Sequence, residues 1–306
     1  LSIASQSDAL LHIVDASGGV DSSGRITEVG SGDPVSDFAD IEEELNMWYH
    51  KILEGNRDKL KKITESDNDP VNALTELYQG LGVKKNHVKE ALKITKLEEK
   101  DIENYDIHDS KKFSTELRRI SKPTLIVANK IDVKGAGKNF QRLRERYNDM
   151  IVVPASADSE LSLRRAEQKE LIKYSPGSEQ FDILKANDLN QKQRDALDFI
   201  KSDIMGEFMH TGVQFAINVT VFKLLKMNSI YPVAIPEKLS DKNGRVLPDL
   251  ILLKDGSTIV DLAKEIHSDL IKGLLYAKDL RYNLRVPTNY QLRDRDVISL
   301  VSASKK

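Results

Sequence analysis

The sequence contains no cysteine and only one tryptophan among its 306 residues. Without cysteine the chain can form no disulfide bond, no thiolate nucleophile and no cysteine-ligated metal site. It also has no apolar run of the roughly 20 residues that a membrane-spanning helix needs. The chain opens at Leu1, without methionine and without the pattern of a signal peptide. The absence of cysteine suits a cytoplasmic protein, and the absence of a long apolar run predicts no membrane partner.

The charges nearly cancel, because the sequence has 46 Lys and Arg and 48 Asp and Glu, which gives a formal net charge of −2. The whole chain is therefore not attracted to nucleic acid or to an anionic membrane, and any such contact requires a local patch. Hydrophobic residues make up 40% and charged residues 31%, as in ordinary globular proteins. The length exceeds that of a typical single domain, so we expect two or three domains.

The most informative stretch is the segment 125–132, which reads Leu-Ile-Val-Ala-Asn-Lys-Ile-Asp. Its apolar half follows Pro123 and predicts a buried strand of a parallel sheet. Asn129, Lys130 and Asp132 then stand at the carboxyl end of that strand, where open α/β sheets bind ligands. The segment therefore predicts a ligand site.

These three polar residues offer chemistry suited to a guanine base. The carboxylate of Asp132 can accept two parallel hydrogen bonds, which guanine offers through N1–H and N2–H2 and adenine does not. A base that leaves a buried carboxylate without a hydrogen-bond partner binds more weakly, and the discrimination against it is roughly 10⁴-fold. The stem of Lys130 can cover the base, and the amide of Asn129 can join neighbouring loops. The alternative is an ordinary polar turn, because an N-K-x-D pattern arises by chance in roughly one such chain in ten.

Two further apolar runs, at 9–14 and 150–153, predict additional buried strands. The second is followed by Ser156 and Ala157, whose small side chains let backbone N–H groups approach a purine carbonyl. The first is followed by Asp15–Gly18, a D-x-x-G pattern that can serve magnesium and the γ-phosphate in nucleotide hydrolases. Such patterns are also common in turns, so this interpretation stays open.

Residues 135–139, Gly-Ala-Gly-Lys-Asn, resemble a phosphate-binding P-loop only superficially. The P-loop pattern G-x-x-x-x-G-K-[ST] needs a glycine where Asp132 stands and a Ser or Thr where Asn139 stands. We interpret the segment as a linker into a helix.

Helical periodicity marks other regions of the chain. Apolar residues recur at steps of three and four over 35–52, which predicts an amphipathic helix packed on a sheet. Residues 56–112 are polar and carry further helical patterns, so we expect an inserted helical subdomain. Four lysines of that subdomain recur at helical spacing. They form either a stripe that binds RNA or an ordinary solvated helix face. These lysines are Lys85, Lys89, Lys93 and Lys96.

Residues 159–228 predict more helices, and at Ser229 the periodicity changes. A compact α+β module follows, with a hairpin-type turn at 241–244, a helix capped by Thr258, and four strands. The strands are expected at 230–233, 250–253, 274–277 and 297–301. The modestly positive charge of this module permits contact with RNA.

Taken in this order, the pieces resemble the YchF subgroup of the Obg-type, translation-associated GTPases, in particular its archaeal form. The terminal module is similar to a TGS domain, which has a β-grasp fold. Five segments carry the resemblance: 11–18, Asn129–Asp132, Ser156–Ala157, 266–270 and 292–298.

The resemblance implies an α/β fold, with a partial Ras-like P-loop NTPase sheet, a helical insertion and a C-terminal α+β β-grasp (TGS) domain. The G domain is expected at 1–55 and 113–228, the helical insertion at 56–112 and the TGS domain at 229–306.

The resemblance also implies a GTP-binding protein associated with ribosomes and translation. By resemblance, Asn129, Lys130 and Asp132 read the base, and Ser156 and Ala157 flank it. Some relatives carry glutamate at the aspartate position and prefer ATP, so Asp132 argues for GTP or GDP. The implied partners are a guanine nucleotide and ribosomal or other RNA, and we expect a monomer.

Relatives also carry a P-loop, a magnesium-binding switch and a D-x-x-G switch upstream of the strand that ends at Asp15, and none stands there in this sequence. We therefore expect the first quarter of the natural protein to be absent and Mg²⁺ to bind with that segment, while the residues present predict no metal ligands. Phosphoryl transfer depends on the absent parts, so the chain as written is not expected to hydrolyse GTP. We also expect an unpaired sheet edge with exposed apolar side chains.

The alternative is a non-catalytic RNA or ribosome binding module. In that case residues 56–112 and 229–306 make the contacts, and nucleotide binding is vestigial. An ordinary metabolic α/β enzyme finds no support, because the sequence has no His-rich cluster, no G-x-S-x-G and no G-x-G-x-x-G pattern.

Overall fold

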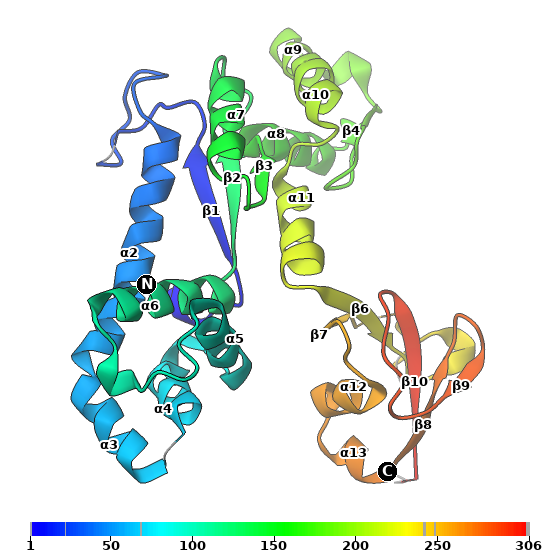
Figure 1. Cartoon of the computed structure of the whole chain (residues 1–306). Helices are drawn as coiled ribbons and strands as arrows, with labels where there is room; N and C mark the ends of the chain where they lie inside the picture. The colour runs from blue at the N-terminus through cyan, green and yellow to red at the C-terminus, as the bar shows by residue number, and fades with distance from the viewer. Residues whose placement is uncertain (1, 22, 68, 241–242, 248, 304–306) are drawn as a thin grey trace. The chain divides into compact units, whose positions relative to one another are not determined.

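The computed structural model describes residues 2–21, 23–67, 69–240, 243–247 and 249–303. The chain divides into two compact units, residues 1–220 and residues 221–306 (Figure 1). Two positions of the predicted turn at 241–244, residues 241 and 242, lie outside the described residues.

Three parallel strands form the sheet of the first unit, in the order β1-β2-β3: β1 (Leu10–Asp15), β2 (Thr124–Asn129) and β3 (Val152–Pro154). The register pairs Asp15 with Asn129, and Ala128 with Pro154. Because β2 has a neighbour on each side, its apolar residues 125–128 are all buried, as a central parallel strand requires. The predicted parallel α/β sheet is confirmed.

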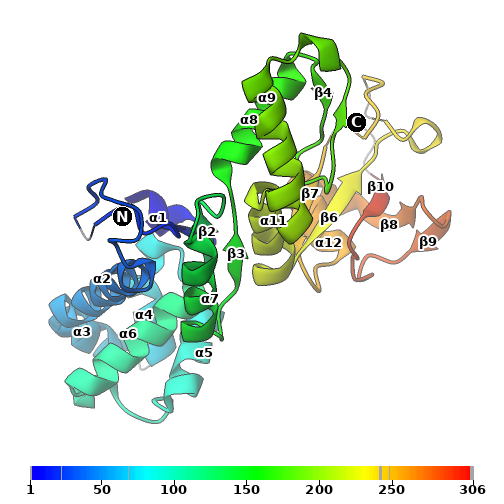
Figure 2. The same cartoon turned by 90° about the horizontal axis from the view of Figure 1, so that it is seen from above.

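Two helices line this sheet. The first, α2 (Pro34–Gly55), begins after Asp33, whose carboxylate accepts the N–H of Val35 and so caps the helix. The second, α7 (Ala136–Arg146), follows the N-K-x-D segment and lies beside β2 in both views (Figures 1 and 2). Phe38 of α2 and Phe140 of α7 share one apolar core with Ile126 of β2. The core therefore fixes the strand end from which the candidate site extends.

Among the described strands, β1 forms an edge of the sheet. Its side chains Leu11 and Ile13 are 39% and 63% exposed. The expected unpaired edge with exposed apolar side chains is therefore present at β1.

A helical subdomain lies between β1 and β2 in the sequence. It has its own core, in which Tyr49 stacks on Tyr78 and Phe113 is fully buried. The four lysines of the predicted stripe are all exposed, three on α5 and the fourth at its C-cap. Its helices are α3 (Arg57–Asp67), α4 (Pro70–Leu77), η1 (Gln79–Leu81), α5 (Lys85–Thr95), η2 (Ile102–Asn104) and α6 (Ile107–Ser121), and a short α1 (Ser2–Gln6) precedes β1.

The rest of the first unit is mainly helical. The prediction of helices throughout 159–228 is wrong for one part, where β4 (Ile172–Lys173) and β5 (Asp182–Ile183) pair as a small antiparallel hairpin. Its strands are too short to show periodicity, and Pro176 and Gly177 break any helix between them. The helices are α8 (Ala157–Gln168), η3 (Ala186–Asp188), α9 (Gln191–Phe199), η4 (Ile200–Met205), α10 (Gly206–Phe208) and α11 (Val213–Asn218). The next helix, η5 (Val219–Leu224), begins in the first unit and ends in the second.

The second unit contains a five-stranded sheet in the order β7-β6-β10-β8-β9, with β10 parallel to β6 and the other pairs antiparallel. One face packs on α12 through a core that includes Ile230, Leu262 and Ile298. This arrangement confirms the predicted α+β module, although β9 has no counterpart in the prediction. The elements are β6 (Met227–Pro232), η6 (Pro236–Lys238), β7 (Ile251–Lys254), α12 (Ile259–Ile266), α13 (Asp269–Gly273), β8 (Leu274–Asp279), β9 (Leu284–Val286) and β10 (Asp296–Ser302).

Candidate functional site

The carboxyl ends of the three parallel strands meet at one edge of the first sheet. Backbone hydrogen bonds continue past the strands, because Ala16 N–H donates to the carbonyl of Asn129 and Ala155 N–H donates to that of Ala128, both at 2.9 Å. Ile131 N–H also donates to the carbonyl of Ala155 at 3.1 Å. The three loops that follow the strands are thus held together at the predicted ligand edge.

Lys130 crosses from β2 to the end of β1. Its Nζ donates to Oδ2 of Asp15 at 2.7 Å, and its backbone has φ of +63°, which is unusual for a residue with a side chain. Ser17 donates to Oδ1 of Asp15 through its hydroxyl at 2.5 Å and its N–H at 3.0 Å. Burial raises the pKa of Asp15, but the bonds from Lys130 and Ser17 outweigh it and hold that pKa below its usual value. A charged carboxylate therefore fixes the ammonium of Lys130.

Asn129 joins the loops after β2 and β3. Its Oδ1 accepts the N–H of Ala157 at 3.1 Å. The side chain thus connects two of the sequence-predicted site residues directly.

Ser156 and Ala157 use their backbone donors within the protein. Ser156 is fully buried and caps α8 by accepting the N–H of Ser159 at 3.1 Å. Its own N–H donates to the carbonyl of Thr211 at 2.8 Å, and the N–H of Ala157 donates to Asn129. The sequence predicts that these two N–H groups bind a purine carbonyl. In the structure both already donate to groups of the protein. In the first turn of α8, the N–H of Asp158 is left without a partner among the described residues.

Asp132 carries the clearest sign of a ligand. Its side chain is partly buried, and Oδ1 is inaccessible to solvent and has no hydrogen-bond partner in the described part of the chain. Leaving a buried acceptor unpaired costs about 1–3 kcal/mol and more for a charged group. A carboxylate matches the two parallel donors of a guanine edge, so the residue type fits that base. Because solvent does not reach Oδ1 in this conformation, the side chain would turn to present both oxygens to the base.

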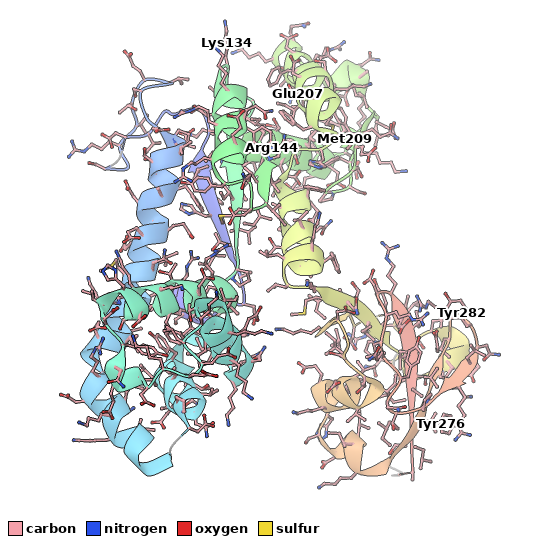
Figure 3. All side chains as sticks on the ribbon, viewed as in Figure 1. Lys134, Arg144, Glu207, Met209, Tyr276 and Tyr282 are labelled. Carbon is pink, nitrogen blue, oxygen red and sulfur yellow. The ribbon has the colours of Figure 1, made fainter. Side chains whose placement is uncertain are left out.

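Sequence reasoning did not identify two residues that shape the site. Asn139 of α7 donates from Nδ2 to the carbonyl of Ala16 at 2.9 Å and so connects α7 to the loop after β1. Thr211 supports Ser156 from a distant part of the chain, and nothing in the sequence marks it. Lys134 is exposed on the loop before α7 and points outward (Figure 3). The loops of the candidate site are thus also held by the side chain of Asn139 and the backbone carbonyl of Thr211, both outside the N-K-x-D segment.

No group of three or more His, Asp or Glu side chains is placed to hold a metal ion in the described part of the chain. None of the helices within those residues combines the length and the apolar character needed to cross a membrane.

Comparison with known proteins relates this chain to GTP-binding proteins. The family profile "Obg-like GTPase YGR210-like, G4 motif-containing domain" matches residues 127–234, which include the N-K-x-D segment. The TGS domain profile matches residues 240–302.

Individual proteins give the same result. A GTP-binding protein of Methanocaldococcus jannaschii is 40% identical over 300 residues, covering 98% of this chain and 74% of the relative. A GTP-binding protein of Schizosaccharomyces pombe is 28% identical over 262 residues, covering 82% of this chain and 62% of the relative. The crystal structure of a GTP-binding protein from Pyrococcus horikoshii matches with a TM-score of 0.80 and 36% identity, covering 98% of this chain and 80% of that one.

Proposed function

The chain belongs to the Obg-like GTP-binding proteins that carry a TGS domain, and from that premise we propose that its strand-end site binds the guanine base of GTP and GDP. The observation that carries the proposal is the buried, unpaired Oδ1 of Asp132. A bound guanine would supply the missing donors through N1–H and N2–H2, whereas adenine presents an acceptor at the equivalent position.

The neighbouring residues have supporting roles in this proposal. Lys130, held at Asp15, would lay its aliphatic stem along one face of the base. Asn129 would fix the loop after β3 through its bond to Ala157. The N–H of Asp158, and not the N–H of Ser156 or Ala157, would serve the guanine carbonyl, because the other two already have partners.

The test is the substitution Asp132→Asn in the protein expressed from its complete gene. Affinities for GDP, ADP and xanthosine diphosphate are measured by calorimetry. We expect GDP binding to weaken by roughly 100-fold, because two hydrogen bonds to a charged acceptor are lost, and xanthosine diphosphate binding to improve. Asp149→Asn is the matched control, since its carboxylate is 62% exposed and pairs with the surface residue Arg119. An Asp132→Asn protein that still prefers GDP would refute the proposal.

Hydrolysis and magnesium binding remain predictions for the whole protein. The chain spans 74% of the Methanocaldococcus jannaschii relative and 62% of the Schizosaccharomyces pombe relative. The expected monomer and the expected cytoplasmic location also stay predictions.

A second function, contact with RNA, is proposed for the C-terminal unit, in keeping with the predicted association with ribosomes. Ala277 and Val286 are buried in the core, so Tyr276, Lys278 and Arg285, at alternate positions of β8 and β9, lie on the opposite face of the sheet. The guanidinium of Arg285 lies 3.8 Å from the centroid of the Tyr276 ring. Figure 3 shows Tyr276 projecting from this unit.

The charge of this outer face supports the second proposal. Strand alternation places Lys254, Lys278 and Arg285 on it, and no acidic residue occupies an outward position on the described strands β6–β10. An aromatic ring stacked with arginine, beside further cations, suits unpaired bases and their phosphates. The alternative is a solvated sheet face that binds no RNA, and a binding experiment with single-stranded RNA distinguishes the two.

A further inference from the structure

A buried hydrogen-bond network supports the loop after β3 from behind. Glu160, in the first turn of α8, is only 4% exposed. Its Oε2 accepts the hydroxyl of Thr211 at 2.5 Å and that of Tyr174 at 2.8 Å, and its Oε1 accepts Nε of Arg164 at 2.6 Å. One carboxylate therefore joins α8, the chain after β4 and the segment between α10 and α11.

Thr211 transmits this support to the proposed base site. Its side chain is held by Glu160, and its carbonyl accepts the N–H of Ser156 at 2.8 Å. Ser156 is followed by Ala157, whose N–H donates to Asn129. Two hydrogen bonds thus connect the buried carboxylate to Ser156, and a third joins the next residue, Ala157, to Asn129.

The next residue after Thr211 makes the contact tight. A Cβ atom at Gly212 would lie 2.0 Å from the carbonyl oxygen of Pro154 and 2.6 Å from Cα of Ala155. The backbone of Gly212 also has φ of +87°, which favours glycine. The segment 211–212 therefore lies directly against the loop, and no side chain separates them.

We propose that Glu160 and Thr211 are positioning residues that hold the Ser156–Ala157 loop in its guanine-binding conformation. This inference rests on the proposed guanine site. Neither residue would touch the nucleotide. They restrict the conformations of the loop before the nucleotide binds, so binding costs less conformational entropy. Replacing either residue should therefore weaken the binding of every purine nucleotide that contacts the loop. The preference for guanine over xanthine should not change, because it depends on Asp132.

The test compares Thr211→Val with Thr211→Ser in the protein expressed from its complete gene. Valine keeps the volume but removes the hydroxyl, whereas serine restores it. We expect about tenfold weaker GDP binding for Thr211→Val, because a hydrogen bond to a charged group is lost, and near-normal binding for Thr211→Ser. In the Asp132→Asn background, Thr211→Val should weaken xanthosine diphosphate binding by the same factor. Hydrogen exchange of the Ser156 and Ala157 amides should accelerate in Thr211→Val.

Thr95→Val is the matched control. Thr95 is also buried, and its hydroxyl donates to the carbonyl of Ala91 at 2.7 Å in the helical subdomain. It should lose stability without losing GDP affinity. Normal GDP binding by Thr211→Val, or an equal loss in Thr95→Val, would overturn the positioning role while leaving the guanine site intact. An Asp132→Asn protein without a switch toward xanthine would refute the site itself, and the positioning role with it.

Discussion

The ammonium of Lys130 lies 2.7 Å from the carboxylate of Asp15, so a residue that follows β2 is anchored at the end of the neighbouring strand. Lys130 is 48% exposed along its side chain, and Asp15 only 12%. The pair therefore lies at the rim of the site, where its carboxylate is shielded and its ammonium is not. Because the ammonium is half exposed, solvent screens its attraction to the carboxylate and the pair contributes little to folding, which points to a role in arranging the lysine stem.

The first prediction concerns Lys130→Met, which keeps an apolar stem and removes the charge. The free energy of unfolding should change by less than about 1 kcal/mol, because the ammonium of Lys130 is half exposed and Ser17 keeps its two hydrogen bonds to Asp15. GDP affinity should fall several-fold, because the stem is no longer anchored over the base. Urea denaturation and calorimetry measure the two quantities. Lys185→Met, which breaks the exposed pair with Glu170, should change neither, and an equal affinity loss there would contradict the prediction.

The second prediction is that Gly212→Ala is severely destabilising. Its new methyl would collide with Pro154 and Ala155, and its backbone would be strained at φ of +87°. Left-handed strain costs about 1–2 kcal/mol and overpacking about 1–3 kcal/mol, so a loss near 3 kcal/mol is expected in urea denaturation. Gly30→Ala separates the two effects, because Gly30 has the same φ of +87° and nothing within 4 Å of its added Cβ. Equal losses in the two variants would show that the close contact is unimportant.

The third prediction is a dependence of stability on pH that arises from Glu160. Burial raises the pKa of Glu160, but hydrogen bonds from Thr211, Arg164 and Tyr174 outweigh it and leave the pKa below its usual value. Such a carboxyl stabilises the fold at pH above its unfolded-state pKa, about 4.3, and the contribution is lost as pH falls through the lower folded value. Glu160→Gln should therefore be less stable than wild type at neutral pH, with the difference shrinking in acid.

Urea denaturation at several pH values tests this point. The variant should lose less stability than wild type between about pH 6 and pH 3. Parallel curves for the two proteins would mean that Glu160 does not carry the expected linkage. Tyr174→Phe, which removes one of the three donors, should give an intermediate curve.

The fourth prediction concerns the outer face of the C-terminal sheet. The protein should bind a single-stranded uridine oligonucleotide with an affinity that falls as salt rises. Tyr276→Ala should weaken binding by about 1–3 kcal/mol at unchanged salt slope, because a stacking surface is lost, and Tyr276→Phe should bind normally. Arg285→Ala should reduce the salt slope by about one, because a phosphate contact is lost.

Fluorescence anisotropy over a salt series measures both quantities. Lys272→Ala is the charge-matched control, since Lys272 lies on α13 with its side chain 84% exposed. Absence of RNA binding, or equal effects of Lys272→Ala and Arg285→Ala, would remove the RNA proposal. Binding of a protein partner at this face would do the same.

Much of the fold could be predicted because its signals are local. The central strand β2 is a continuous apolar run, and the polar residues that follow it stand at its carboxyl end in the structure. The terminal α+β module was also predicted from its change in periodicity. Short elements were missed, since two or three residues, as in β4, β5 and β9, carry no periodic signal.

The site itself was only half predictable. The order of Asn129, Lys130 and Asp132 and their position after a strand suit a guanine base, and their role in binding one stays a prediction. The sequence could not show that Asn129 and Thr211 would take up the backbone donors of Ala157 and Ser156. It also gave no reason to connect Glu160 with Thr211.

The sequence by itself determined which strand is central to the parallel sheet, which polar side chains stand at its end and which family the chain belongs to. These features depend on residue types at neighbouring positions, which a sequence displays directly. Only the tertiary structure decided which partner each of these groups takes. The anchor of Lys130 at Asp15 and the support of Ser156 by Thr211 join residues far apart in the chain. Such contacts are fixed by the packing of whole elements, which brings distant backbone and side-chain groups within hydrogen-bond distance.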